Sequence, residues 1–404
     1  MGCVKSICHF AICLAMGNCV ARALEPDSSN EIVLGMSTVL TGPAENLGKQ
    51  MQTGVWAGLE RSNRAGGVRG RKFRLIVLDD GYEPSRTVPN VRQLIEKDDV
   101  LAIIGDVGTP TATVAIPIAN EQKTLFFASF SGGGILRKKP PDRYVINFRA
   151  SYAEETARMI DALVEGAGLK PDEIAFFTQR DSYGNAGFDG GIAALKNHGL
   201  KEEKDVLNVG YERNTLAVED AVATLLVAEH LPRAVIMVGA YAPCGKFIKL
   251  CHEGGLQALF LNVSFVGSSS LAHELGKIDA AVIVTQVVPY PLDENVSLVR
   301  EYQTDLRAAD PSALPEFGGL EGYIATRILV LALDKIEGQL TRETIVDALE
   351  KLGQFDIGLG EPLNLSPNEH QASHRIWPTI LKDGGFVPFQ WDNIGHLLKN
   401  EAQR

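Results

Sequence analysis

Two short apolar runs, each followed by glycines and small hydroxyl residues, constrain this chain more than any other feature. The run at 100–104 leads, after a glycine-containing turn, into Thr109-Pro110, and the run at 125–128 leads into a segment rich in Ser and Gly. Runs of this length and hydrophobicity are typical of strands buried in a parallel sheet. Because neighbouring parallel strands end at the same edge, the two polar segments are expected to form a crevice of the kind that binds ligands in open α/β sheets.

A helix is predicted to begin at Thr109. Threonine is a favoured N-cap residue, and proline fits the first helical position. The free N–H groups and the positive end of the helix dipole would then offer a general site for an anion or a polar ligand. The alternative is that both segments are ordinary strand-to-helix turns without a ligand.

The first residues have the pattern of a targeting segment. Lys5 precedes an apolar stretch at about 7–15, and a small-x-small cleavage pattern ends at Ala23. This combination predicts that residues 1–23 are a secretory signal peptide, cleaved on export to the periplasm. The apolar stretch is shorter than the roughly 20 residues that span a bilayer.

Charge and cysteine content narrow the function further. Loss of the leader would remove Lys5, Arg22 and no acid, which changes the formal net charge from −11 to −13. An acidic chain without a basic block argues against binding to nucleic acids or anionic membranes.

The leader also contains four of the six cysteines, and the remaining pair, Cys244 and Cys251, is seven residues apart in a predicted helix. A separation of roughly 10 Å between their Cα atoms excludes a disulfide, so two free thiols are expected.

Strands and helices alternate in two rounds through the rest of the chain, from about 31 to 148 and from 152 to 285. This alternation predicts right-handed crossovers and parallel sheets. Three predicted helices follow without strands between them and are expected to return to the first sheet, at about 297–308, 319–337 and 342–352. The predicted fold class is α/β, with two doubly wound parallel-sheet lobes.

Patterns of catalytic or cofactor-binding residues are largely missing. Neither phosphate-binding glycine motif occurs, and Ser131 lacks the first glycine of a nucleophile elbow. His370 and His374 could offer metal ligands, but the neighbouring Pro367 and Asn368 favour a loop with solvated histidines. We therefore predict no cofactor, no metal site and no enzymatic activity; a serine hydrolase using Ser131 is the alternative. A protein with polar groups at the sheet edge and no catalytic set is more often a binding protein.

Several motifs together resemble the type I periplasmic solute-binding proteins of ABC transporters, of the leucine/isoleucine/valine-binding-protein-like family. They cover nearly all of the chain after the leader and are as follows: Thr41-Gly-Pro, Asn63-x-x-Gly66-Gly67, Asp79-Asp80, Ile104-Gly105 and Asp181-Ser-Tyr183-Gly184. The resemblance implies two lobes joined by a three-segment hinge near 148–152, 285–290 and 355–358. It places one lobe at 24–149 and 287–356 and the other at 150–286 and 357–404.

The resemblance also implies the ligand-binding positions. Thr109, next to Gly108, falls where a first-lobe hydroxyl receives the ligand carboxylate, and the following loop offers Ser131, Gly132 and Gly133. Tyr183 and Tyr241 fall on aromatic positions of the opposing lobe. The alternatives are that Thr109 only caps its helix, that Tyr183 caps a turn and that Tyr241 belongs to the core.

Two departures from the family pattern bear on the solute. Ser264 stands where relatives that bind α-amino acids have an acid for the ammonium group, and Leu47 stands where some have Trp. A buried ammonium without a carboxylate is costly, which argues against a standard α-amino acid. A carboxylate, amide, aromatic or apolar solute is favoured, unless Glu321 or Asp106 supplies the missing charge.

The resulting expectation is a monomeric solute-binding component of an importer, which closes on a small molecule and docks on an inner-membrane permease complex. The alternative keeps the fold but reports the ligand to a membrane receptor kinase or serves a transport system of another type.

Overall fold

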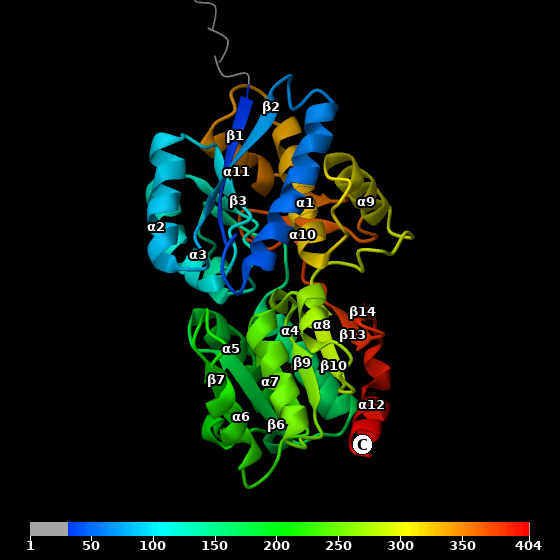
Figure 1. The fold of residues 1–404 in the computed structure, drawn as a ribbon. Helices are drawn as coiled ribbons and strands as arrows, with labels where there is room; N and C mark the ends of the chain where they lie inside the picture. Colours follow the sequence, from blue (N-terminus) through cyan, green and yellow to red (C-terminus); the bar gives the residue numbers. More distant parts are fainter. Residues whose placement is uncertain (1–30, 404) are drawn as a thin grey trace, which may run out of the picture.

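The computed structural model describes residues 31–403 and contains two lobes, which lie one above the other in Figure 1. Each lobe is built on a sheet with helices on both faces, which confirms the predicted α/β class with parallel sheets in two lobes. The predicted leader lies outside the described residues. Among the helices that are described, none has both the length and the hydropathy of a membrane span.

The first lobe contains a five-stranded parallel sheet in the order β2-β1-β3-β4-β5. Its strands are β1 (Glu31–Thr38), β2 (Lys72–Asp79), β3 (Ala102–Ile104), β4 (Leu125–Phe127) and β5 (Val145–Ile146). Its helices include α1 (Glu45–Arg64), α2 (Pro84–Arg92) and α3 (Thr109–Glu121). The short strands β3 and β4 are fully buried, as their apolar sequences predict.

The second lobe contains a seven-stranded sheet in the order β14-β13-β10-β9-β8-β6-β7, in which only β13 and β14 run antiparallel to their neighbours. The strands are β6 (Ile174–Gln179), β7 (Asn208–Tyr211), β8 (Ala234–Val238), β9 (Leu259–Asn262), β10 (Val282–Gln286), β13 (Trp377–Lys382) and β14 (Gly385–Pro388). The helices are α4 (Tyr152–Asp161), α5 (Ser182–Asn197), α6 (Glu219–Leu226), α7 (Tyr241–Glu253), α8 (Ser268–Leu275) and α12 (Ile394–Glu401).

Helices from the C-terminal half return to the first lobe, as expected. They are α9 (Ser297–Ala309), α10 (Phe317–Asp334) and α11 (Arg342–Glu350). In Figure 1, α9 and α10 lie beside α1. The α1–α10 approach requires Gly54, because a Cβ atom there would lie 1.7 Å from the carbonyl oxygen of Gly319.

The chain passes between the two sheets three times, after β5, after β10 and between β12 (Leu363–Leu365) and β13. Strand β12 pairs with β11 (Gly353–Phe355) in a separate two-stranded sheet. Two of the passages run side by side, because the Asn147 N–H donates to the His370 carbonyl at 2.7 Å and the Ser373 N–H donates to the Phe148 carbonyl at 2.8 Å.

Candidate solute-binding site between the lobes

Thr109 and Ser131 come together at the edge of the first sheet. Their hydroxyl oxygens are 2.8 Å apart, and both side chains are buried. The N-cap of α3 is Gly108 and not Thr109, whose side chain makes no capping hydrogen bond. The interpretation of Thr109 as only a cap is therefore wrong, and its hydroxyl belongs to the polar edge of the sheet.

The three glycines predicted for the site shape this edge. Gly108 has a φ of 108°, which other residues rarely adopt, and a Cβ atom there would lie 2.1 Å from the Tyr82 ring. The Gly132 carbonyl accepts from the Tyr152 N–H at 2.9 Å, and the Gly133 N–H donates to the Ser131 hydroxyl at 3.1 Å. Gly132 thus joins the first lobe to the start of α4.

Aromatic rings of the two lobes pack against one another. Phe265 lies at their centre, with ring centroids 5.9 Å from Tyr82 and 5.5 Å from Phe130 in the first lobe. In the second lobe, its centroid lies 4.7 Å from Tyr183 and 6.5 Å from Tyr152. Phe265 therefore contacts aromatic rings from both lobes.

Tyr183 is fully buried and lies in the first turn of α5. Its hydroxyl donates to the Gly239 carbonyl at 3.2 Å, and the N-cap of this helix is Asp181. Tyr183 is thus a core ring at the interlobe surface and not a turn cap.

Ser264 belongs to a buried polar cluster. Its N–H and hydroxyl donate to the two carboxylate oxygens of Glu155, at 2.8 Å and 2.9 Å. The Thr285 hydroxyl also donates to Glu155, at 2.6 Å. Arg149 donates to the Ser264 hydroxyl and lies 3.4 Å from Glu155 and 3.5 Å from Glu321. An acid is therefore present beside the serine, although it comes from α4.

Burial and the neighbouring charges set the protonation of this cluster. Burial raises the pKa of Glu321 to about 7 against the opposing effect of Arg149. Burial alone would lower the pKa of Arg149, but Glu321 and Glu155 raise it. Asp106, the other acid considered from the sequence, has a pKa well above its usual value because it is buried and lies near Asp80.

Leu47 of the first lobe and Tyr241 of the second lie beside the same glycine, Gly267. Both side chains are buried, and a Cβ atom at Gly267 would lie 2.7 Å from Leu47 and 3.4 Å from Tyr241. Tyr241 also lines a pocket of about 260 Å³ together with Asn46 of α1. Leu47 and Tyr241 thus meet at Gly267, whereas Thr109 contacts Ser131 at the sheet edge, Tyr183 packs on Phe265 and Ser264 bonds Glu155.

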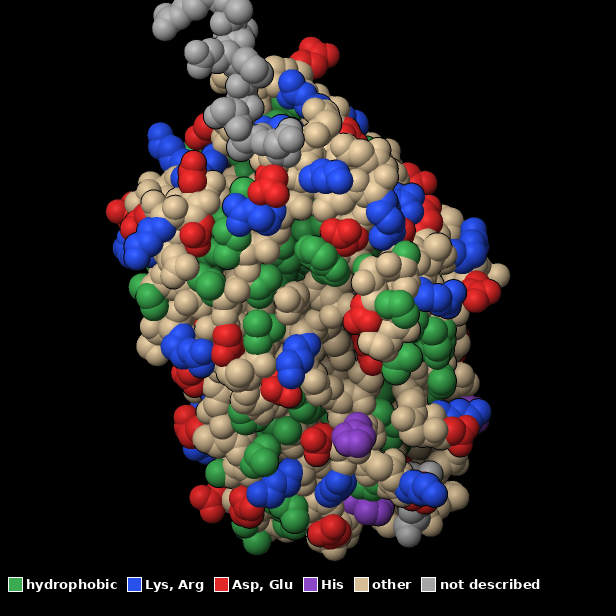
Figure 2. All heavy atoms as spheres, turned by 45° about the horizontal axis from the view of Figure 1, so that its top comes forward, with side chains coloured by type: hydrophobic (Ala, Val, Ile, Leu, Met, Phe, Trp, Pro, Cys, Tyr) green, Lys and Arg blue, Asp and Glu red, His purple; other side chains and the backbone are tan. Residues whose placement is uncertain are grey.

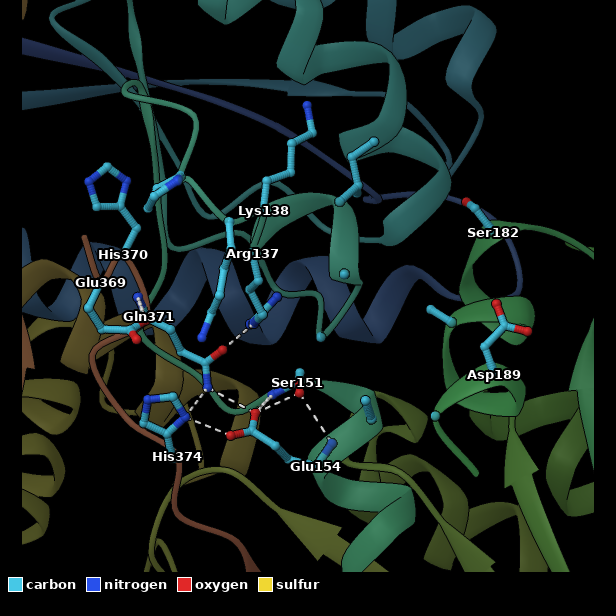
Figure 3. Close-up of a pocket in the computed structure, with 18 of the residues that line it drawn as sticks. Arg137, Lys138, Ser151, Glu154, Ser182, Asp189, Glu369, His370, Gln371 and His374 are labelled. Atoms are coloured by element: carbon cyan, nitrogen blue, oxygen red, sulfur yellow. Dashed lines mark hydrogen bonds and ion pairs between the residues drawn. The ribbon is translucent and has the colours of Figure 1, made fainter. Parts of the chain in front are cut away.

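A larger cavity of about 740 Å³ lies beside this region (Figure 3). It is lined by Gly132 and the following loop of the first lobe, by the first turns of α5, and by the segment at 368–374. Arg137 donates to the carbonyls of Ser131 and Gly133 and to the Gln371 side chain. The cavity therefore adjoins the hydroxyl-bearing loop and the passages between the lobes.

The two histidines of the HxxxH pattern have different partners and do not form a metal-binding pair. His370 is buried and contacts the Val145 carbonyl and Glu350, so its interpretation as a solvated side chain is wrong. His374 is exposed and lies 2.6 Å from Glu154, as seen in Figure 3.

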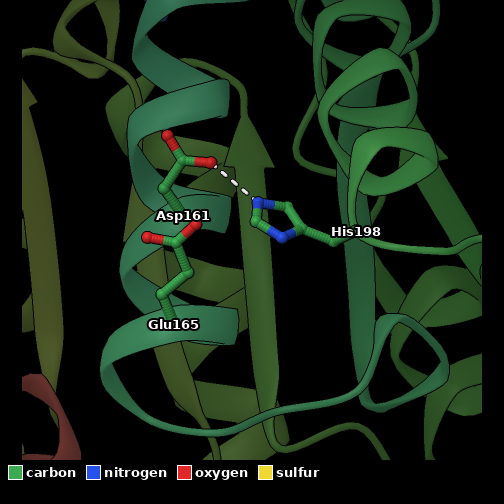
Figure 4. Close-up of side chains that lie close together, drawn as sticks. All are labelled: Asp161, Glu165 and His198. Atoms are coloured by element: carbon green, nitrogen blue, oxygen red, sulfur yellow. Dashed lines mark hydrogen bonds and ion pairs between the residues drawn. The ribbon is translucent and has the colours of Figure 1, made fainter.

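Asp161, Glu165 and His198 lie together on the second lobe, away from this region (Figure 4). His198 and Asp161 are 2.8 Å apart, a contact that joins the end of α5 to α4. The absence of a metal site stays a prediction.

Sequence reasoning missed Arg149, Tyr152, Glu155 and Phe265. A weak signal was present, because an arginine inside the apolar segment at 145–150 is unusual unless it is paired. Phe265 gave no signal, since a lone phenylalanine after a strand normally indicates core.

A family model described as periplasmic binding protein matches residues 31–385. The chain belongs to this periplasmic binding protein family. The proteins of this family that resemble the chain are binding proteins and not enzymes. The chain is of the type I, leucine/isoleucine/valine-binding-protein-like kind.

Three similar proteins illustrate the relationship. A possible leucine/isoleucine/valine-binding protein from Rhodopirellula baltica SH 1 is 47% identical, with a TM-score of 0.88, over 92% of this chain and 99% of that one. Leu/Ile/Val-binding protein homolog 1 from Brucella abortus is 24% identical over 90% of this chain and 91% of its own length. A fatty acid ABC transporter substrate-binding protein from Thermomonospora curvata is 21% identical, with a TM-score of 0.80, over 92% and 94%, and shows the fold alone.

Proposed function

We propose that this protein is the substrate-binding component of an ABC-type importer, which captures a small organic solute between its lobes and delivers it to an inner-membrane permease complex. One observation carries the proposal: Thr109 and Ser131 of the first lobe and Tyr183 and Ser264 of the second all border the same buried interlobe region. A solute in this region would contact both lobes and would therefore favour the closed form.

Closure requires a hinge, for which the three passages between the sheets are the natural elements. The first two are the segments at 147–151 and 287–296. We place the third at 366–376 and not at 355–358, as the resemblance implied, because the backbone of 366–376 runs alongside Asn147 and Phe148. The lobes are then residues 31–146 with 297–365, and residues 152–286 with 377–403.

The solute is not a standard α-amino acid in this proposal. By the family resemblance, Ser264 stands where relatives that bind α-amino acids have an acid for the ammonium group, and Glu155 beside it already accepts hydrogen bonds from Ser264, Thr285 and Arg149. The relatives are named for leucine, isoleucine and valine and for fatty acid, so membership of the family does not decide the solute.

The test is a screen of a solute library against the mature protein by thermal shift. A solute that binds only the folded state raises the melting temperature, and small-angle scattering should then show a smaller radius of gyration. Ser131→Ala should weaken the binding of the solute found, whereas Ser312→Ala, on an exposed loop of the first lobe, should not. A solute that binds equally well to both variants would contradict this location of the site.

We also propose that the protein is exported to the periplasm through a cleaved signal peptide and that it acts as a monomer. N-terminal sequencing of the exported protein should begin at Leu24. A start at Met1 would contradict cleavage.

A further inference from the structure

Arg149 is buried at the junction of the two lobes with N–H groups that have no hydrogen-bond partner. Its side chain is 1% exposed. One terminal nitrogen is satisfied by Ser264, but Nε and Nη1 make no hydrogen bond with any described residue, and Nη1 only lies 3.5 Å from Glu321. Buried donors of this kind are normally satisfied by a protein or ligand acceptor.

Tyr152 lies between Arg149 and the hydroxyl-bearing loop of the first lobe. Its guanidinium carbon is 5.6 Å from the centre of the Tyr152 ring, whose backbone N–H bonds Gly132. The Tyr152 hydroxyl also makes no hydrogen bond of good geometry with any described residue. A series of donors therefore runs from Thr109 and Ser131 through Tyr152 to Arg149.

The buried acids nearby are poorly suited to an ammonium group. Both oxygens of Glu155 accept hydrogen bonds from Ser264, and one also accepts from Thr285. Burial raises the pKa of Asp106 well above its usual value and the pKa of Glu321 to about 7, which disfavours the charged form of both acids. A cationic head group would meet Arg149 without a free carboxylate to balance both charges.

The remaining surroundings are apolar. The Arg149 guanidinium lies 5.0 Å from the centre of the Phe130 ring, which in turn packs on Phe265. A small solute with an acceptor-rich head and an apolar body would match these surroundings, with the head at the donors and the body at the rings.

We propose that Arg149 determines the charge of the bound solute, and that the solute is a small carboxylate with an apolar body and no α-ammonium group. This inference rests on the proposed function. The family resemblance implied that Ser264 determines which solute binds. In this proposal Arg149 determines it, and Ser264 only holds Arg149 in place.

The experiment compares solutes that share a body and differ in the head group. The panel contains monocarboxylates from acetate to phenylpropionate, the primary amide of each, the corresponding primary amines, and L-leucine and L-phenylalanine. Calorimetry at pH 7 should show that the wild-type protein binds at least one carboxylate. The affinity for this carboxylate should exceed the affinity for its amide by about 10- to 100-fold, the range of a charge-assisted hydrogen bond.

Two variants assign the preference to the cluster. Arg149→Gln should remove the carboxylate-to-amide preference. Glu321→Gln should keep or strengthen carboxylate binding, because it removes a competing negative charge. Arg213→Gln is the control, since Arg213 joins the lobes through Glu83, 2.9 Å away, and lies apart from the Arg149 cluster. The Arg213→Gln variant should weaken the binding of all solutes by the same factor and leave the preference for a carboxylate over its amide unchanged.

The outcomes separate this inference from the proposed function. Preferred binding of an amine or an amino acid, or loss of carboxylate binding in Glu321→Gln, would overturn the assignment but leave a solute-binding protein. A wider library that contains no ligand at all would overturn both. If Arg149→Gln does not fold, the response of Glu321→Gln still decides the sign of the charge.

Discussion

Glu321 illustrates how the fold sets the chemistry of a single residue. It lies on α10, is 3% exposed, and its nearest opposite charge is Arg149 at 3.5 Å. This contact is too long to offset the loss of water, so burial raises the pKa from 4.5 to about 7. The carboxyl group therefore changes protonation within the neutral range at the boundary between the lobes.

Stability should consequently fall as the pH rises through this range. The unfolded chain releases the Glu321 proton near pH 4.5 and the folded chain near pH 7, so the folded state loses relative stability between these values and the full loss is present above pH 7. Glu321→Gln mimics the protonated form and should raise the free energy of unfolding at pH 8 by about 3 kcal/mol, with a much smaller gain at pH 5. Urea unfolding at both pH values measures this difference.

Glu154 provides a control of opposite sign. Burial raises its pKa, but hydrogen bonds from His374, Ser151 and Gln371 outweigh this effect and lower it to about 2. Its contribution to stability is present above pH 4.5 and is lost as the pH falls toward 2. Glu154→Gln should therefore reduce stability at pH 8. Equal effects of the two variants at pH 8 would contradict this account.

Tyr183 should act through its ring and not through its hydroxyl. The ring packs against Tyr152 and Phe265, whereas the hydroxyl is used within the second lobe by Gly239. Tyr183→Phe should therefore keep solute affinity. Tyr183→Ala should lower the free energy of unfolding by about 3–5 kcal/mol, as is usual for a buried aromatic ring. Calorimetry and urea unfolding separate these effects; a selective loss of binding in the Phe variant would show that the hydroxyl contacts the solute.

Elements with a strong local pattern were predicted well. The strand at 234–238 and the alternation of both lobes followed from buried apolar runs, and α3 begins at Thr109 as predicted, although Gly108 caps it. The first turns of helices α5 and α7 contain Tyr183 and Tyr241, which have no helical pattern in the sequence. The Arg149 cluster could not be predicted, because its members meet only when α4, α10 and the loop after β9 pack together.

The contact between α1 and α10 likewise joins residues that are far apart in the sequence, and it depends on Gly54. Gly54→Ala would place a methyl group 1.7 Å from the Gly319 carbonyl oxygen, a backbone atom that cannot move without separating the helices. We expect a loss of about 1–3 kcal/mol in the free energy of unfolding, although alanine is the better helix former. Thr53→Ala, one residue away on a more exposed face, should not be destabilising to this extent. A Gly54→Ala variant as stable as the wild type would contradict the close packing.

At the scale of the whole molecule, polar contacts of Arg213, Asn214 and Gln179 help to join the two lobes. Arg213 lies 2.9 Å from Glu83 of the first lobe and 3.1 Å from Asp181 of its own lobe. Asn214 donates to the Gly81 carbonyl at 3.0 Å, and Gln179 donates to the Tyr82 hydroxyl at 3.2 Å. In the proposed closing movement, these contacts would form only in the closed form and would contribute to the equilibrium between the open and closed forms. Figure 2 shows acidic and basic side chains intermingled over the visible surface, which favours such individual pairs over a general attraction between the lobes.

Removing Arg213 should therefore open the molecule without unfolding either lobe. Arg213→Gln loses a partly buried ion pair, which contributes about 1 kcal/mol and corresponds to a roughly fivefold shift toward the open form. The radius of gyration of the solute-free variant should increase in small-angle scattering, and the affinity for any solute that requires closure should fall by about the same factor. Arg180→Gln is the matched control, because Arg180 pairs with Glu212 within the second lobe, 3.5 Å away. A change of equal size in both variants would mean that the closed form does not depend on the pairing of Arg213 with Glu83.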